Sequence, residues 1–502
     1  MAADPAVRAV TADGAGGPSP SFGSLGPDPF RAVALQTASG MAWTGVAMLL
    51  GFAVKVLMTR KMLPRDMGIV LTAQAFAALA GAVATLGVPD AIVRLVGIHA
   101  RGDAAPKLLV RVGVRTAVVA TGAAAAIALA ALVVAPLTSP DAWWAAVIFT
   151  MVLPAAGMGE VLGAAYRGIG RFATKLVLVD VLRPLLVVVA LLLSPVVLTR
   201  RAPYVAALFA VSTLGSLAAI WITFRGDGRW RSGDTVTVAE LLRFGVPMAA
   251  TVLLAGPIIN NVLPLMISAW TDTAAVAFYA VAISIYGLVY LPVGVLEQAV
   301  TPSWAHMVAH DTSEALARSF QRYTSLCFSG AAGLALVAMA NDGILLTTVF
   351  GPPFEAAGGA VRVAIAAAMG TAATGPNEAM LHALGRSRSI FTARLAGAMA
   401  GVGVGLIVIP AYGLMGGISA FAVTTVGING LYGAMLYRQT GISPFTWRQA
   451  GTIAVAAIGV LAATVMVNAY PVAGRVTATI IGIAIVAAQP DMRAAARHLL
   501  RL

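Results

Sequence analysis

Apolar stretches of about 20 residues alternate with short polar segments along nearly the whole chain. A helix of about 20 apolar residues is long enough to cross the hydrocarbon core of a bilayer, which is about 30 Å thick. Each stretch is therefore predicted to be a transmembrane helix, about fourteen in all. They are 34–58, 67–88, 111–136, 143–164, 174–198, 203–224, 242–268, 275–297, 322–349, 358–382, 390–410, 413–437, 449–469 and 473–489.

The pattern occurs twice, roughly 215 residues apart. Residues Gly163–Phe172 and Leu381–Arg388 each join two apolar stretches through a short basic segment that contains glycine. Residues 55–71 and 261–279 share an apolar pattern with a short polar break at the same place. An internally duplicated membrane protein is most simply a carrier, because two related bundles can rock about a site held between them.

Composition indicates that the solvent of this chain is lipid. The sequence is 59% hydrophobic and 11% charged, and its mean hydropathy is +0.89. A soluble protein of 502 residues cannot bury that much apolar surface. The net charge of +13 does not indicate a nucleic-acid partner, because excess Arg and Lys in a membrane protein mark its cytoplasmic loops.

The basic residues predict an orientation. With a cytoplasmic N-terminus, 24 Arg and Lys residues fall in the even-numbered connections and the two tails, whereas six fall in the outer connections. This distribution follows the positive-inside rule. The chain is therefore predicted to be a multi-pass protein of the cytoplasmic (inner) cell membrane with both termini in the cytoplasm.

Metal and thiol chemistry have little support in the sequence. The single cysteine, Cys327, lies in an apolar stretch, so neither a disulfide nor a thiolate metal site is expected. His306 and His310 are spaced i, i+4 but have no third ligand close in sequence, and we interpret them as loop residues. No cofactor, metal site or catalytic residue is predicted.

Three basic residues, Lys55, Arg183 and Arg362, lie inside apolar stretches. A charge near the centre of a membrane helix costs about 2.5–3.5 kcal/mol, so these side chains are expected to face a polar interior cavity. Their acidic companions are Glu160, Asp180, Glu297 and Glu378. Two alternatives stay open: Asp180 and Arg183, spaced i, i+3, can neutralise each other, and Lys55 and Arg362 can extend to the membrane interface. Pro184 is expected to kink its helix toward the cavity.

The seventh apolar stretch contains a further polar anomaly. Pro257, Asn260, Asn261 and Pro264 place two prolines and two amides at mid-membrane depth. Such groups are tolerated there only where protein or water satisfies them. Because Asn261 is the approximate repeat partner of Lys55, we expect the two residues to lie on facing walls of one cavity.

Three tyrosines in the eighth stretch follow near-helical spacing, namely Tyr279, Tyr286 and Tyr290. They fit a face that contacts a sugar. They fit equally an aromatic belt at the membrane interface. The sequence leaves both interpretations open.

Five segments, taken in their order and spacing, resemble the polysaccharide transporter family of Wzx-like flippases. They are Thr59–Gly68, Leu86–Arg94, Leu242–Pro247, Phe350–Phe354 and Ile409–Gly417. The likeness extends over about residues 40–440. This family belongs to the multidrug/oligosaccharidyl-lipid/polysaccharide exporter superfamily.

The resemblance implies an all-α polytopic fold in which two pseudo-symmetric six-helix bundles surround a central cavity, followed by a C-terminal helix pair. The expected parts are a flexible cytoplasmic tail (1–30), an N-terminal bundle (31–235), a C-terminal bundle (236–440) and two further helices with a cytoplasmic tail (441–502). It also implies transport, rather than catalysis, of undecaprenyl- or dolichyl-pyrophosphate-linked oligosaccharides from the cytoplasmic to the outer leaflet.

The hypothesis is therefore a flippase that moves a lipid-linked oligosaccharide by alternating access. Lys55 and Arg183, followed by Arg362, are the candidates to bind the pyrophosphate, and Asn260 and Asn261 line the same site. Nothing in the sequence requires coupling to an ion. A coupling H⁺ or Na⁺ would bind one of the acids, namely Glu160, Asp180, Glu297 or Glu378. Membrane lipids and a glycan polymerase or glycosyltransferase are the expected partners.

Two other classes of function stay open. A cation-coupled multidrug exporter of the same superfamily would have a more acidic and aromatic cavity, because its cargo is usually cationic. A membrane-embedded glycosyltransferase or polymerase would use paired acids in an outer loop. Asp342 and Glu355 are the acids that share one outer connection.

Overall fold

The computed structural model describes residues 29–99, 105–134, 139–231, 237–255, 258–310, 313–443 and 471–488. The regular elements of these residues are helices apart from β1 (Ala105–Pro106) and β2 (Trp230–Arg231), which pair in parallel. The predicted all-α class is confirmed. The predicted tail of residues 1–30 and the predicted span 449–469 lie almost wholly or wholly outside the described residues.

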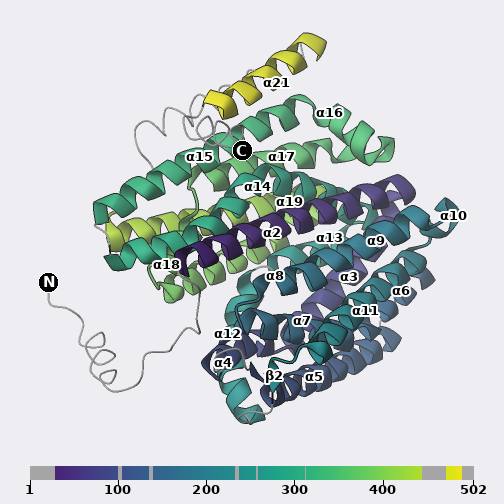
Figure 1. Ribbon diagram of the computed structural model, residues 1–502. Coiled ribbons are helices and arrows are strands. Elements are labelled where there is room, and N and C mark those ends of the chain that lie inside the picture. Colours follow the sequence, from purple (N-terminus) through teal and green to yellow (C-terminus); the bar gives the residue numbers. More distant parts are fainter. Residues whose placement is uncertain are drawn as a thin grey trace.

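The first half of the chain forms one group of helices, which lies in the lower part of Figure 1 apart from α2. Its elements are α2 (Pro29–Lys61), α3 (Pro64–Ala84), α4 (Val88–His99), α5 (Lys107–Val134), α6 (Pro140–Met151), α7 (Leu153–Gly168), α8 (Phe172–Lys175), η1 (Leu176–Val181), α9 (Leu182–Leu193), α10 (Val196–Thr199) and α11 (Ala202–Gly226).

The second half forms the upper group in Figure 1 apart from α12, which packs on α4 of the first half, and α21 packs on α15. Its elements are α12 (Val238–Ala255), η2 (Ile258–Val262), α13 (Leu263–Trp270), α14 (Thr273–His310), α15 (Ser313–Ala340), α16 (Asp342–Ile344), η3 (Leu345–Phe350), η4 (Pro352–Ala357), α17 (Gly358–Ala373), α18 (Asn377–Ala383), α19 (Ser387–Thr440) and α21 (Pro471–Ala488).

Ten helical stretches among the described residues are long and apolar enough to cross a membrane. One of them, α19, is 54 residues long and contains two predicted spans. The backbone bends between these spans at Gly413, where φ is +53°. Pro410 lies just before this bend and removes a hydrogen bond of the helix. The chain is a multi-pass membrane protein, and the total of fourteen spans stays a prediction.

Helix α2 lies between the two groups. It packs against α9 and η1 of the first half and against α14 of the second, and Figure 1 shows it as the purple helix that crosses the middle of the molecule. Helix α3 likewise packs on α5 and α6 and also on α13 and α14. These two helices therefore form the wall at which the halves meet.

Both ends of α3 touch the second half through backbone atoms. A Cβ atom added to Gly68 would lie 1.6 Å from the carbonyl oxygen of Thr273, and one added to Gly87 would lie 2.1 Å from that of Gly245. Gly87 also has a positive φ of +68°. Only glycine fits such an approach, so these positions fix how closely the halves meet.

The repeated segments have the same geometry in both halves. Gly170 and Gly385 adopt positive φ angles of 75° and 68° after α7 and α18. The amides of Arg171 and Arg386, one residue further on, donate to carbonyls five residues back, at 2.8 and 2.9 Å. This is the Schellman pattern that ends a helix at glycine. The duplicated sequence therefore encodes a duplicated turn.

Candidate functional site

Three adjoining hollows follow the meeting wall of the two halves. The charged hollow, of about 440 Å³, is lined mainly by α3, α4, α7, α8 and α9 around Glu160 and Arg183. The amide hollow, of about 370 Å³, lies between α2, α3, η2 and α14. A connecting hollow of about 240 Å³ shares Glu160 and Arg183 with the first, and Lys55 and Gln74 with the second. The three make one polar path.

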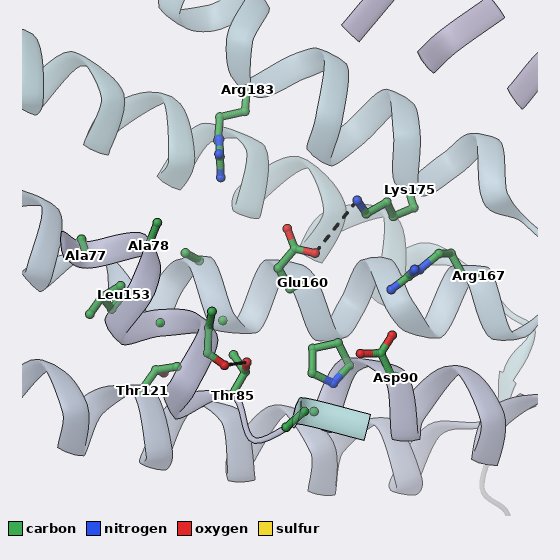
Figure 2. A pocket seen from close by; sticks show the side chains of 17 residues that line it. Ala77, Ala78, Thr85, Asp90, Thr121, Leu153, Glu160, Arg167, Lys175 and Arg183 are labelled. Atoms are coloured by element: carbon green, nitrogen blue, oxygen red, sulfur yellow. Dashed lines mark hydrogen bonds and ion pairs between the residues drawn. The ribbon is translucent and has the colours of Figure 1, made fainter. Parts of the chain in front are cut away.

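The charged hollow contains cations and acids from four separate segments. Figure 2 shows Arg183 extending toward Glu160, with Lys175 on the other side of this carboxylate and Arg167 and Asp90 further along. Burial raises the pKa of the Asp90 carboxyl, although the charge of Arg167 opposes this effect. The Asp90 carboxyl is thus partly shielded from solvent.

Lys175 neutralises the acids of this region. Its Nζ donates to both carboxylate oxygens of Asp180 at 2.7 Å and lies 4.0 Å from Glu160. The ion-pair partner of Asp180 is therefore Lys175, and the alternative in which Asp180 pairs with Arg183 is wrong. Lys175 precedes Asp180 by five residues, which is the spacing that a π-turn brings together, and η1 is such a turn.

The other cations of the path have no carboxylate within 4.0 Å among the described residues. They are Lys55, Arg167 and Arg183. The Nε of Arg167 is buried and lacks a hydrogen-bond partner in that part of the chain. Cations without a carboxylate at ion-pair distance favour an anion that offers several acceptor oxygens.

Two wide helical turns carry lining residues of the path. Asp180 lies in η1, and Asn260 and Asn261 lie in η2. Pro184 follows Asp180 by four residues, and Pro264 follows Asn260 by four residues. A proline ring clashes with the carbonyl four residues earlier, which here belongs to Asp180 and Asn260, and a π-turn relieves that clash. The prolines therefore shape the wall of the cavity.

The structure brings together most of the residues singled out from the sequence. Lys55 and Asn261 line the amide hollow from opposite halves, and Lys55 and Arg183 line the connecting hollow. Arg362 lies elsewhere: it pairs with Asp342 at 2.6 Å, and its side chain is 56% exposed. Asp342 is therefore an ion-pair partner, rather than one member of an acid pair with Glu355.

The remaining two acids belong to a cluster inside the second half, outside the three hollows. Glu378 forms ion pairs with Arg394 and, at 3.4 Å, with His382. Glu297 accepts a hydrogen bond from Tyr290 at 3.5 Å. In each half, an acid that precedes the repeated glycine turn forms an ion pair with a cation that follows it. The pairs are Glu160 with Lys175 and Glu378 with Arg394.

The tyrosines lie inside the molecule. Tyr286 and Tyr290 stack with ring centroids 5.6 Å apart, and Tyr279 is 3% exposed and lines the amide hollow. An interfacial belt does not describe residues in these positions. The Tyr279 hydroxyl is buried without a hydrogen-bond partner among the described residues.

Sequence reasoning missed four charged or amide residues that line this path. Arg167 and Lys175 belong to the basic residues assigned to a cytoplasmic connection, because basic charge between two apolar stretches indicates a loop, but both line the charged hollow. Asp90 follows the second apolar stretch directly. Gln74 had a usable signal, since it is an amide within that stretch.

Residues 35–307 match a family model described as polysaccharide biosynthesis protein. The match covers more than half of the chain. The chain belongs to this family. A search of curated proteins finds no match.

Solved transporter structures share the fold. The lipid II flippase MurJ in an inward closed conformation superposes with a TM-score of 0.67 at 13% identity, over 89% of this chain and 98% of that one. An inward-facing multidrug resistance MATE family transporter of the MOP superfamily gives 0.62 at 17% identity, over 81% and 98%. A MOP superfamily transporter from Pyrococcus furiosus gives 0.55 at 16% identity, over 84% and 97%.

Proposed function

We propose that this polysaccharide biosynthesis protein is a flippase for a polyprenyl-pyrophosphate-linked oligosaccharide. The observation that supports the proposal is the path between the halves, in which Lys55, Arg167 and Arg183 have no carboxylate partner in the described part of the chain. A pyrophosphate fits these cations, because charge-assisted hydrogen bonds to Arg and Lys are strong where water is scarce.

The head group is the part of the lipid-linked oligosaccharide that needs a protein to cross the membrane. A sugar-pyrophosphate cannot cross hydrocarbon unaided, because its polar groups would lose their water without replacement. The charged and amide hollows replace that water with cations and amides, while the polyprenyl chain stays in the lipid. Alternate tilting of the two halves would then expose the path to each side in turn.

Movement in the outward direction has an electrical driving force. We place both termini in the cytoplasm, so the head group travels away from the negative side of the membrane. Two negative charges that cross in this direction gain roughly 4–5 kcal/mol per 100 mV. The acids of the path and of the second half are the candidate sites for a coupling H⁺ or Na⁺: Glu160, Asp180, Glu297 and Glu378.

A multidrug exporter is the alternative that the shared fold allows. The charge balance of the path argues against it, because four cations and three acids line the hollows. A cationic drug would meet Lys55, Arg167 and Arg183 at the positions where an exporter of cations needs acids.

Deletion of the gene tests the proposal directly. Lipid-linked oligosaccharides would be measured by mass spectrometry with leaflet-resolved detection. A flippase predicts that the completed oligosaccharide accumulates on the cytoplasmic leaflet. Unchanged lipid-linked pools would favour export of a small molecule, and a truncated glycan would indicate an enzyme.

A further inference from the structure

The beginning of α12 packs on the first half of the chain, although α12 is the first helix of the second half. Leu241 is 1% exposed and belongs to the apolar core that α4, α5, α7 and α11 form. Phe244 packs against the same core, and the guanidinium carbon of Arg94 lies 4.8 Å from the centre of its ring. The carbonyl of Gly245 meets Gly87 so closely that no Cβ atom fits between them. This part of α12 is therefore docked on the first half.

The connection that precedes α12 is held on the first half as well. Strand β2 pairs with β1, and the Trp230 side chain in β2 is 4% exposed. The ring centroid of Trp230 lies 5.6 Å from that of Tyr166 and 4.9 Å from that of Phe224. The carboxylate of Asp227 accepts the amide of Arg229 at 3.2 Å and so shapes the turn before β2. The chain is thus attached to the first half both before α12 and along its beginning.

The other end of α12 leads to the second half. Helix α12 also packs against α19, and η2 follows it in the chain. Among the described side chains of α12, none packs in the apolar core that contains α13, α14, α15 and α17. Ala249, whose amide nitrogen approaches Gly87, is the last of its residues with a contact to the first half given by these observations. Helix α12 therefore passes from one half to the other.

We propose that residues 238–249, which we call the α12 strap, move with the first half when the carrier tilts. This inference rests on the proposed flippase function, because it requires two halves that tilt. If the strap left the first half, Leu241 and Phe244 would lose their apolar surroundings. The two moving parts are then joined after Ala249, shortly before η2, which carries Asn260 and Asn261 in the wall of the amide hollow.

The strap gives the tilting of the halves a direct effect on the substrate path. One end of α12 is fixed to the first half, and η2 lines the path from the second half. Rotation of the halves about the end of the strap changes the position of η2 relative to α2 and α3, which form the other walls of the amide hollow. The shape of this hollow therefore changes in each transport cycle.

Cross-linking in cells tests the strap. All variants carry Cys327→Ala, because Cys327 is the only cysteine of the chain. The test pair is Arg94→Cys/Phe244→Cys, which joins α4 to the strap. The control pair is Arg60→Cys/Val349→Cys, which joins α2 to η3 across the halves. Dibromobimane enters cells and bridges neighbouring thiols, and mass spectrometry of the joined peptides verifies each bridge. Export is measured as labelled glycan that reaches the cell surface after bridging.

The strap predicts different results for the two pairs. The bridge between Arg94→Cys and Phe244→Cys should leave export unchanged, because both residues move with the first half. The bridge between Arg60→Cys and Val349→Cys should lower export at least about tenfold, because it blocks the conformational step. Single-cysteine variants treated with the same reagent control for labelling alone, and each double variant must export glycan before it is bridged.

The reactivity of single cysteines provides a second measurement. Leu241→Cys should stay unreactive toward N-ethylmaleimide in exporting cells, because its side chain remains in the core of the first half. Val238→Cys is the matched control: it lies on the same helix, where Val238 is 48% exposed, and should react throughout.

Each result bears on one of the two proposals. If the bridge between Arg94→Cys and Phe244→Cys stops export, or if Leu241→Cys reacts during export, the strap is wrong and the flippase proposal stands. If neither bridge affects export, the halves do not tilt, and both the strap and alternating access are wrong. If the unmodified protein exports no glycan, the flippase proposal fails before any bridge is made.

Discussion

Lys175 is the ion-pair partner of two acids that line the path with Arg183. It holds Asp180 at 2.7 Å and approaches Glu160, so these acids are partly neutralised before they can pair with Arg183. If the path binds an anion, as we propose, a carboxylate that pairs with Arg183 would compete with the ligand. At the residue scale, we therefore propose that Lys175 acts indirectly, through the acids that it pairs with.

Replacement of Arg183 should abolish most of the transport. We expect Arg183→Gln to lower glycan export at least about tenfold, since one charge-assisted hydrogen bond is lost. Glycan display at the cell surface, normalised to the membrane abundance of the variant, measures this. Arg362→Gln is the matched control and should keep normal display, because Arg362 pairs with Asp342 away from the path. An equal loss of glycan display in both variants would contradict the assignment of Arg183 to the substrate site.

We expect Lys175 to affect glycan export through its ion pairs with Asp180 and Glu160. Lys175→Met frees Asp180 and Glu160 to attract Arg183, so export should fall several-fold. Lys175→Met/Asp180→Asn removes the acid as well and should recover part of the export. A double-mutant cycle on glycan display measures the coupling. Additive losses would show that Lys175 does not act through Asp180.

At the element scale, two π-turns decide which side chains reach the path. An extra residue in a turn rotates everything that precedes it relative to a regular α-helix, and π-turns often occur at functional positions. Here they carry Asp180 in η1 and the two asparagines in η2. The cavity wall therefore depends on local backbone geometry as well as on residue type.

Pro184→Ala tests this dependence. The substitution removes the clash with the carbonyl of Asp180 and allows a regular α-turn, which would rotate Asp180 away from Lys175. We expect export to fall while the thermal unfolding temperature stays the same or rises. Glycan display and unfolding in detergent measure the two effects. Normal export in a stable variant would mean that the π-turn does not shape the site.

At the scale of the whole molecule, α3 joins the halves at both of its ends. Gly68 meets Thr273 at one end and Gly87 meets Gly245 at the other, each against a backbone carbonyl. In addition, Arg60 donates to the carbonyl of Val349 at 2.9 Å across the halves. A carrier that tilts its halves must break the contact with Thr273, whereas Gly245 stays beside Gly87 if the α12 strap moves with the first half, as we propose.

Gly68→Ala should disturb this closed arrangement. The added Cβ would overlap the Thr273 carbonyl oxygen, and a backbone atom cannot move away without shifting the half that carries it. Overpacking of this kind costs about 1–3 kcal/mol, so the unfolding temperature should fall. Gly287→Ala, on the same helix as Thr273 but with no atom near its Cβ position, is the control and should be neutral or stabilising.

Orientation is testable for the whole chain. Reporter fusions after Arg231 and after Leu502 should both report a cytoplasmic location, as the distribution of Arg and Lys predicts. Alkaline phosphatase and fluorescent protein fusions give opposite signals on the two sides of the membrane. An external signal at either position would overturn the predicted topology and, with it, the direction of transport.

The sequence by itself determined the features that depend on local periodicity. The apolar stretches indicated the helices, and the glycine turns near 170 and 385 indicated the duplication. Lys55, Arg183 and Asn261 were identified as cavity residues, because a charge or amide inside an apolar stretch is costly unless the interior is polar. Each of these inferences uses only the residue and its neighbours along the chain.

Tertiary structure decided the partners. Asp180 pairs with Lys175 rather than Arg183, Arg362 is neutralised by Asp342, and Arg167 lines the path although it ends a helix. Ion-pair choice depends on distances of a few ångströms between elements, and a π-turn or a packed glycine changes those distances without any signal in hydrophobic periodicity. The sequence therefore specified which residues are polar in the membrane, and the packing of the helices specified which of them form ion pairs and which line the path.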